Sequence, residues 1–218
     1  MKVYTINIKL LSDALINSGQ GFGAIIDSDV VFDDIGIPYI PAKRIKGCLR
    51  DAAEKTCNML NLAGINFLNN STINSVFGIR GGASPAPVYF SNLVIDDYEN
   101  NKLWLEYLRG KQTDILSRES IMSTFSTLRQ QTRIDESGIA DEHSLRTIRV
   151  LSKWILFKGE VQLFGDETEV AKLLSLACLN LRHIGTKRNR GFGEVECKLY
   201  DGRAEVSIFS ELESLCKK

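Results

Sequence analysis

Two helical patterns, each enclosed between strand patterns, constrain the fold of this chain more than any other feature. Residues 3–10 alternate polar with apolar side chains, which is typical of a half-buried strand. The full order is strand, helix, strand, arm, strand, helix, strand. It predicts an α+β fold with a ferredoxin-like (RRM-like) βαββαβ core, an inserted arm and helical insertions. The strand patterns occupy 2–11, 87–95, 153–164 and 192–201, and the helical patterns occupy 41–60 and 165–185.

The ends of both predicted helices carry residues that suit them. Pro41 lacks the backbone N–H that a first helical turn leaves without a partner. Asp166 or Thr168 is expected to cap the second helix. Gly185 is expected to end that helix in the left-handed conformation.

The length and amino-acid composition of the chain are typical of a protein that folds as one domain. Of 218 residues, 44% are hydrophobic and 25% are charged, so a core of ordinary size can be buried. Acidic and basic residues balance at 27 each, so any nucleic-acid partner must be inferred from local clustering of charge. We expect one domain over 1–218. It comprises a first strand, loop and basic helix (1–60), an inserted arm region (96–152) and a second half with a glycine-rich loop (153–200).

Several classes of protein are disfavoured. No apolar run approaches the ~18 residues of a membrane span, and no signal-peptide pattern follows the N-terminus. The five cysteines are scattered without a CxxC pair, which indicates reduced thiols rather than a metal site. We therefore expect no membrane association, a cytoplasmic location and no certain metal ligands.

A basic, glycine-rich loop lies between the second helix and the last strand, in the sequence IGTKRNRGFGEVEC at 184–197. Glycines let backbone N–H groups approach an anion, and the cations suit a phosphodiester backbone. The loop leaves a helix and enters a strand, so it fits neither a Walker loop nor a Rossmann fingerprint. The other interpretation is a flexible connection with solvated cations. The candidate RNA-binding residues here are Gly185, Lys187, Arg188, Arg190, Gly191 and Gly193.

A second basic cluster favours the nucleic-acid interpretation. It lies at the start of the first helix, where free N–H groups and the helix dipole already attract anions. In a βαββαβ domain this helix start and the glycine-rich loop can lie near one another. Two basic elements on one face of a neutral protein predict a surface that contacts an RNA or DNA backbone. The cluster consists of Lys43, Arg44, Lys46 and Arg50.

Three segments together resemble a known superfamily. IPYIPAKRIKGCLRDAAE at 37–54 is similar to the I-P-x-S-x-[LI]-K-G-x-[LIM]-R segment of the RAMP superfamily of CRISPR-associated proteins. IGTKRNRGFGEV at 184–195 resembles the glycine-rich loop of that superfamily, and SVFG at 75–78 matches its Phe-Gly pair. The motifs have the expected order and separation.

Within the superfamily, GFGAIIDSDVVFDD at 21–34 resembles a loop of the repeated backbone subunit of type III effector complexes. The resemblance implies binding of CRISPR guide RNA, Mg²⁺-dependent cleavage of target RNA, contacts with other effector subunits and self-association into a filament. Asp27 matches the loop aspartate implicated in cleavage. Asp29 is the backup candidate and stands where the family usually has proline.

The segment TRIDESGIADEHSLRTIRV at 132–150 resembles the β-hairpin thumb of that family. The resemblance implies that Arg129, Arg133 and Ile134 help to push a nucleotide out of the stack. The exposed phosphate would then undergo in-line attack by its own 2′-hydroxyl. Asp27 would act as the base or hold a Mg²⁺ ion.

Three other functions remain open at this stage. One is a guide-binding scaffold without cleavage, and another is a guide-processing endoribonuclease. Against the latter, no histidine precedes His143, and His183 is expected at the end of the second helix. The third is a ferredoxin-like domain that binds a small nucleotide. Trp104 and Trp154 are expected to pack within the core or the insertions.

Overall fold

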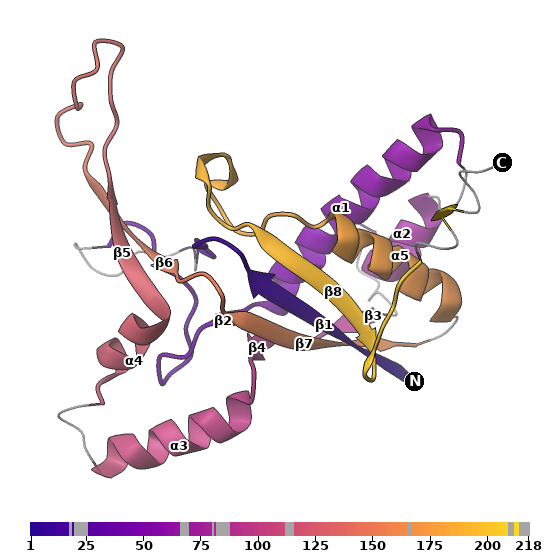
Figure 1. Ribbon diagram of the computed structural model, residues 1–218, viewed down its shortest axis with the longest axis horizontal. Coiled ribbons are helices and arrows are strands. Elements are labelled where there is room, and N and C mark those ends of the chain that lie inside the picture. The colour runs from indigo at the N-terminus through magenta and orange to yellow at the C-terminus, as the bar shows by residue number, and fades with distance from the viewer. Residues whose placement is uncertain are drawn as a thin grey trace.

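The computed structural model describes residues 1–17, 19, 26–65, 70–79, 81, 88–111, 116–164, 167–208 and 212–213. An antiparallel sheet of seven strands forms the centre, in the order β2-β4-β7-β1-β8-β9, with β3 also paired to β7 (Figure 1). The four strand positions of the βαββαβ core are occupied, in chain order, by β1, by β3 with β4, by β7 and by β8. In the sheet, β7 and β1 are central and β8 lies beside β1, which is the ferredoxin-like order, so this prediction is confirmed. The strands are β1 (Lys2–Leu10), β2 (Tyr39–Ile40), β3 (Val88–Phe90), β4 (Leu93–Ile95), β7 (Leu156–Leu163), β8 (Val195–Asp201) and β9 (Ala204–Glu205).

Three helices lie together beside the sheet: α1 (Ala42–Leu62), α2 (Asn70–Phe77) and α5 (Glu167–Asn180) (Figure 1). Both predicted helices are therefore confirmed as elements. Pro41 is the N-cap of α1 rather than a residue of its first turn. Thr168 lies inside α5, and Asp166 falls outside the described residues. Gly185 was wrongly expected to end α5, because the helix stops at Asn180.

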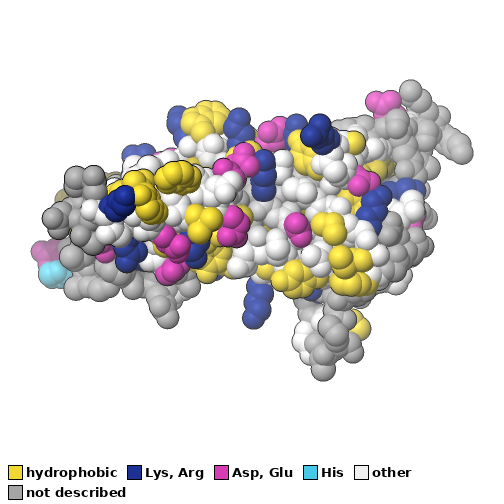
Figure 2. Space-filling view, turned by 90° about the horizontal axis from the view of Figure 1, so that it is seen from below, with side chains coloured by type: hydrophobic (Ala, Val, Ile, Leu, Met, Phe, Trp, Pro, Cys, Tyr) yellow, Lys and Arg dark blue, Asp and Glu magenta, His cyan; other side chains and the backbone are white. Residues whose placement is uncertain are grey.

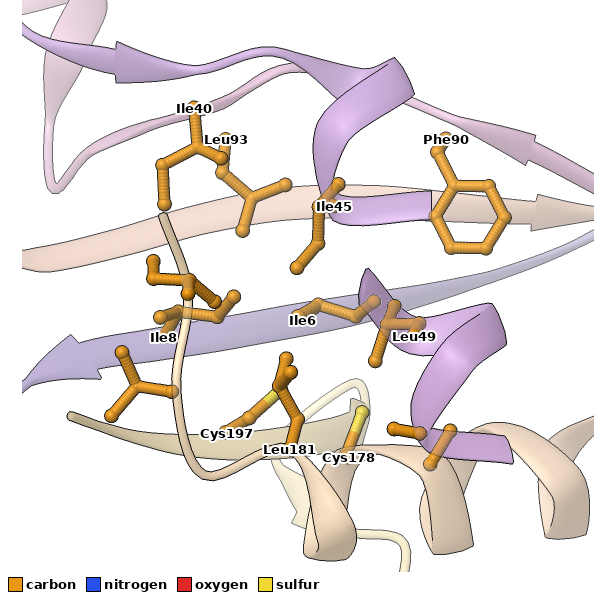
Figure 3. Close-up of a cluster of buried hydrophobic side chains, with 14 of the residues drawn as sticks. Ile6, Ile8, Ile40, Ile45, Leu49, Phe90, Leu93, Cys178, Leu181 and Cys197 are labelled. Atoms are coloured by element: carbon orange, nitrogen blue, oxygen red, sulfur yellow. The ribbon is translucent and has the colours of Figure 1, made fainter. Parts of the chain in front are cut away.

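The core lies between the sheet and the helices (Figure 3). The alternation in β1 is confirmed, because Ile6 and Ile8 are completely buried while their neighbours are partly exposed. Ile45 and Leu49 of α1 pack into the same cluster. In β7, Gly159 leaves room for β4, since an added Cβ would meet the Leu93 side chain at 2.8 Å. The local pattern thus sets which face of each element is buried.

The insertion contains α3 (Tyr98–Lys111) and α4 (Arg118–Phe125), so the expected helical insertions are confirmed. No residue of α3 is buried, and apolar side chains gather over its outer face (Figure 2). Trp104 of α3 is 64% exposed and Trp154 is 57% exposed. Neither tryptophan packs in the core, so the expectation was wrong for Trp154, whereas Trp104 does pack edge-on against Tyr107 within the inserted helix α3.

The arm is a long β-hairpin formed by β5 (Ser126–Gln131) and β6 (Arg146–Leu151), and it projects away from the sheet (Figure 1). Near its tip, Ile134 and Ala140 form a bridge, so the hairpin continues beyond the two strands. The predicted projecting arm is therefore confirmed. Within the described part of the chain, no helix has the length and apolar character needed to cross a membrane.

Candidate nucleic-acid interface

The glycine-rich loop is closed against the segment that follows β1. The N–H of Thr186 donates to the carbonyl of Leu15 at 3.0 Å. A Cβ on Gly185 would lie 2.4 Å from the same carbonyl oxygen, and a Cβ on Gly193 would lie 2.0 Å from the carbonyl oxygen of Ile184. Both glycines also have positive φ. The structure thus gives these two glycines a packing role, and their contact with RNA stays a prediction.

Gly191 differs from those two glycines. Its φ is +78°, but an added Cβ would meet no heavy atom within 4 Å. It follows the short 3-10 helix η1 (Arg188–Arg190), whose two arginines are exposed. A ligand can therefore reach the backbone and the charged side chains at the tip of the loop (188–191), whereas the ends of the loop at Gly185 and Gly193 are packed against the protein.

A pocket of about 780 Å³ lies between α1 and the glycine-rich loop. Its α1 wall includes Cys48 and Lys55, and its loop wall includes Lys187, Arg188 and Arg190. His183, predicted near the end of the second helix, also lines this pocket. The loop stands between α1 on one side and the arm on the other (Figure 1).

The predicted loop cations line this pocket, whereas the predicted α1 cations lie in the first half of that helix and are not among the residues that line it. Burial raises the pKa of the Cys48 thiol, and the charges of Arg188 and Arg44 both oppose that rise. The charge of the Asp51 carboxylate adds to the rise, so charges of both signs act on this thiol. The loop cations and α1 thus face one pocket, which Asp51 also lines, and contact of the two predicted basic clusters with one RNA strand stays a prediction.

The four cations of α1 do not share one environment. Lys43 is exposed, whereas Arg44 and Lys46 are partly exposed. The Arg50 guanidinium donates to the Gly78 carbonyl at 2.8 Å and to Asn74 Oδ1 at 3.0 Å, and it also pairs with Glu54. Arg50 thus joins α1 to α2 through the Phe-Gly segment. Its guanidinium is engaged within the protein, which leaves Lys43, Arg44 and Lys46 as the cations available to a ligand.

Asp27 and Asp29 have different surroundings. The Asp29 carboxylate is buried, pairs with Arg149 at 3.0 Å and accepts the N–H of Val30 at 2.7 Å. Asp27 is exposed, and its Oδ2 accepts the N–H of Thr147 at 2.8 Å. Asp29 is therefore a structural residue of this region, and Asp27 is the carboxylate that a ligand can reach.

Asp27 lies where the arm and the glycine-rich loop meet. Its Oδ1 is 3.8 Å from Nη1 of Arg146, at the start of β6. Lys187 of the loop donates to Gln131, which pairs with Arg146 across the hairpin. Burial lowers the pKa of Lys187, as do the charges of Arg190 and Arg146, and the Asp27 carboxylate opposes that shift. An exposed carboxylate and three cations thus share one small region.

The predicted arm cations form ion pairs on the arm or at its base. Arg129 Nη2 lies 2.8 Å from Asp13 Oδ2, and Arg133 Nε lies 3.1 Å from Asp141 Oδ2. Both arginine side chains are more than half exposed, so these pairs are weak and can exchange for phosphate. His143 also lies on the arm, and it is exposed.

Sequence reasoning missed the residues that hold the aspartate. Thr147, Arg146 and Gln131 belong to the two arm strands, far from Asp27 along the chain. No motif marks them, since their role depends on how the hairpin base packs against the segment after β1. Among the described residues, no group of three or more His, Cys, Asp or Glu side chains is placed to hold a metal ion.

Comparisons with known proteins agree with this description. A model of the RAMP superfamily matches residues 7–196. One similar solved structure is described as the cryo-EM structure of the Type III-B Cmr-beta bound to cognate target RNA. It has 15% identity and a TM-score of 0.67 and covers 91% of this chain and 97% of the matched chain. The corresponding apo-state structure gives the same identity and coverage with a TM-score of 0.66. No curated protein matches the sequence.

Proposed function

This chain belongs to the RAMP superfamily, and from that membership we propose that it is a subunit of a type III CRISPR effector complex. In this role it binds guide RNA and cleaves the complementary target RNA. The likeness to structures of the Type III-B Cmr-beta supports the assignment. The observation that carries the proposal is the position of the glycine-rich loop, which brings cations both to the α1 pocket and to Asp27.

Guide RNA is proposed to follow the groove between α1 and the glycine-rich loop. Lys43, Arg44 and Lys46 approach its phosphates from α1, while Arg188 and Arg190 do so from the loop. Exposed cations can change partners at little cost, so the contacts depend on charge more than on sequence. This suits a protein whose guide varies, because base pairing rather than the protein reads the target.

Target cleavage is proposed to occur at Asp27. The Thr147 amide fixes the carboxylate at the base of the arm, and its second oxygen lies 3.8 Å from Nη1 of the exposed Arg146 side chain. From this position Asp27 takes the proton of a 2′-hydroxyl, whose oxygen bonds to the adjacent phosphorus as the bond to the 5′-oxygen breaks. The products are a 2′,3′-cyclic phosphate and a 5′-hydroxyl that takes its proton from water, while Lys187 and Arg146 offset the charge of the phosphate. One carboxylate with RNA oxygens and water also fits Mg²⁺, which would supply further neutralisation of phosphate charge.

The second candidate is a subunit that binds guide RNA without cutting. One observation favours it: Asp29 is used in a buried ion pair, so Asp27 is the one carboxylate of the two that faces solvent. In either role, the chain is proposed to contact other effector subunits and to associate with further copies of itself as a filament. Both kinds of contact would form between this chain and its neighbours in the complex.

The test is cleavage of a complementary target by the assembled complex in Mg²⁺. Asp27→Ala should abolish cutting while target binding is retained, and a 2′-deoxy substitution at the scissile position should do the same. Asp34→Ala is the matched control, because Asp34 is an exposed aspartate of the same region that pairs only with Lys102 among the ion pairs described. Unchanged cutting by Asp27→Ala would overturn the catalytic role of Asp27, and a wild-type complex that binds the target without cutting it would leave the guide-binding scaffold as the function.

A further inference from the structure

Trp154 combines a strained backbone with an exposed side chain. It lies in the short connection between β6 and β7, and its φ is +75°. This conformation is costly for a bulky residue, and it is often found at functional sites. Its N–H donates to the Leu10 carbonyl at 2.8 Å, so the backbone is fixed at the end of β1. Burial of the indole does not explain the conformation, since the residue is 57% exposed.

Two lysines surround this indole. Nζ of Lys9 lies 5.3 Å from the ring centroid, and Nζ of Lys153 lies 5.6 Å from it. Both lysines are exposed and neither has an ion pair among the described contacts. Each ammonium group can therefore turn from the ring to a phosphate without breaking a salt bridge.

A second pocket lies at the glycine-rich loop, and Lys153, the residue before Trp154, lines it. This pocket has a volume of about 520 Å³ and is lined by Lys153 together with Arg129, Gly191 and Phe192. It is formed by the arm, the loop and the segment after β1, on the side of the loop away from α1. Lys153 therefore links the two features, since its Nζ lies 5.6 Å from the Trp154 ring centroid and the residue also lines the pocket.

We propose that Trp154 is a stacking platform for one unpaired nucleobase of the RNA that crosses the glycine-rich loop. The inference rests on the proposed RNA-binding function and adds a contact to the base itself. An exposed indole offers a π-face to any base, and the adjacent Lys9 and Lys153 suit the phosphates on either side. Stacking of this kind tolerates every sequence, as a guide-dependent protein requires.

The position also explains why the backbone is strained. At φ +75° the side chain of Trp154 projects from a connection whose flanking residues, Leu151 and Phe157, point into the core. A residue with ordinary φ would not interrupt the strand path in this way. The chain thus holds an apolar ring in water next to Lys153, which lines a pocket together with the paired Arg129 and Asp13, and a nucleobase can cover the ring there.

The experiment uses the intact chain with Trp104→Phe, so that Trp154 is the one remaining tryptophan of two. A short single-stranded oligouridine should quench its fluorescence. An abasic ribose-phosphate strand of equal length should bind about 5- to 100-fold more weakly and cause little quenching. Trp154→Gly then removes the ring without a cost in backbone strain, since glycine accepts positive φ. This variant should lose the preference for the base-bearing strand, and Trp154→Phe should keep most of it.

The outcomes separate the two proposals. If RNA binds with a steep salt dependence, but the two strands bind equally and Trp154 is not quenched, then the stacking site is wrong and the RNA-binding function stands. If Trp154→Gly keeps the full preference for bases, the stacking site is likewise overturned. If the chain and its complex bind neither strand, both proposals fail together.

Discussion

The backbone N–H of Thr147 donates to Oδ2 of Asp27 at 2.8 Å, which joins residues 120 positions apart. The Asp27 N–H in turn donates to the Thr147 carbonyl at 2.9 Å. The candidate catalytic carboxylate is thus fixed by the root of the arm rather than by its own loop. The resemblance to the family thumb implies that the same arm displaces a nucleotide, so the proposed catalytic carboxylate and this arm are joined directly by two hydrogen bonds.

Asp27→Asn should separate the charge of this residue from its hydrogen bond. The amide oxygen can still accept from Thr147, so we expect the free energy of unfolding to change by less than about 0.5 kcal/mol. Target cleavage by the complex should nevertheless fall strongly, because an amide neither takes a proton nor carries charge. Urea unfolding of the chain and cleavage assays on the complex measure the two effects. Full cleavage by the asparagine variant would contradict the role of Asp27.

Asp29→Ala should destabilise the fold by about 3–5 kcal/mol, because it leaves the Arg149 guanidinium buried without its carboxylate partner. Thermal or urea unfolding gives the value. Asp34→Ala removes an aspartate whose side chain is 75% exposed, and it should change stability little. Equal stability of the two variants would mean that the buried pair is not needed for folding.

Gly193→Ala and Gly191→Ala should differ in their effects on stability, although both glycines have nearly the same φ. A Cβ at Gly193 would meet the Ile184 carbonyl oxygen at 2.0 Å, so this variant should lose about 3 kcal/mol or more. A Cβ at Gly191 meets nothing within 4 Å, and only the backbone cost of about 1–2 kcal/mol applies. Unfolding curves for the two variants provide the comparison, and similar losses would refute the packing role of Gly193.

Arg50→Ala and Arg44→Ala should affect different properties. Loss of the Arg50 bonds to Gly78 and Asn74 should reduce the free energy of unfolding by about 1.5–3 kcal/mol. Arg44→Ala should leave stability nearly unchanged and weaken RNA binding, with the slope of log affinity against log salt reduced by about 0.7. Titrations at several salt concentrations test this assignment. It fails if Arg44→Ala leaves the salt slope unchanged.

Lys187→Met should change how stability depends on pH. Burial lowers the pKa of Lys187, so near the ordinary pKa of lysine the unfolded chain binds this proton more tightly than the folded chain. The contribution of Lys187 to the free energy of unfolding is therefore smallest at a pH where the folded and unfolded chains both hold this proton. It rises with pH between the lowered pKa of the folded chain and the higher pKa of the unfolded chain. The methionine variant should lack this rise in unfolding experiments between neutral and alkaline pH. A rise of the same size in both proteins would exclude Lys187 as its source.

The sequence determined the elements and their faces, because period and spacing are local properties. The alternation in residues 3–10 and the helical spacing after Pro41 predicted β1 and α1, with Ile6 and Ile45 in the core. The three motifs likewise identified the superfamily that the family model matches. The βαββαβ order also predicted that the first helix and the loop before β8 lie near one another, and both line one pocket, α1 through Cys48 and Lys55.

Only the tertiary structure decided what each residue does within that frame. Asp27 and Asp29 are two positions apart in the sequence, but one meets the amide of Thr147 and the other the side chain of Arg149. Arg50 and Arg44 belong to the same basic segment of the sequence, yet the Arg50 guanidinium donates to the Gly78 carbonyl after α2. Trp154 is apolar and was expected inside, but it is exposed. Partners far along the chain decide these differences, and local pattern carries no information about them because it describes neighbours in sequence alone.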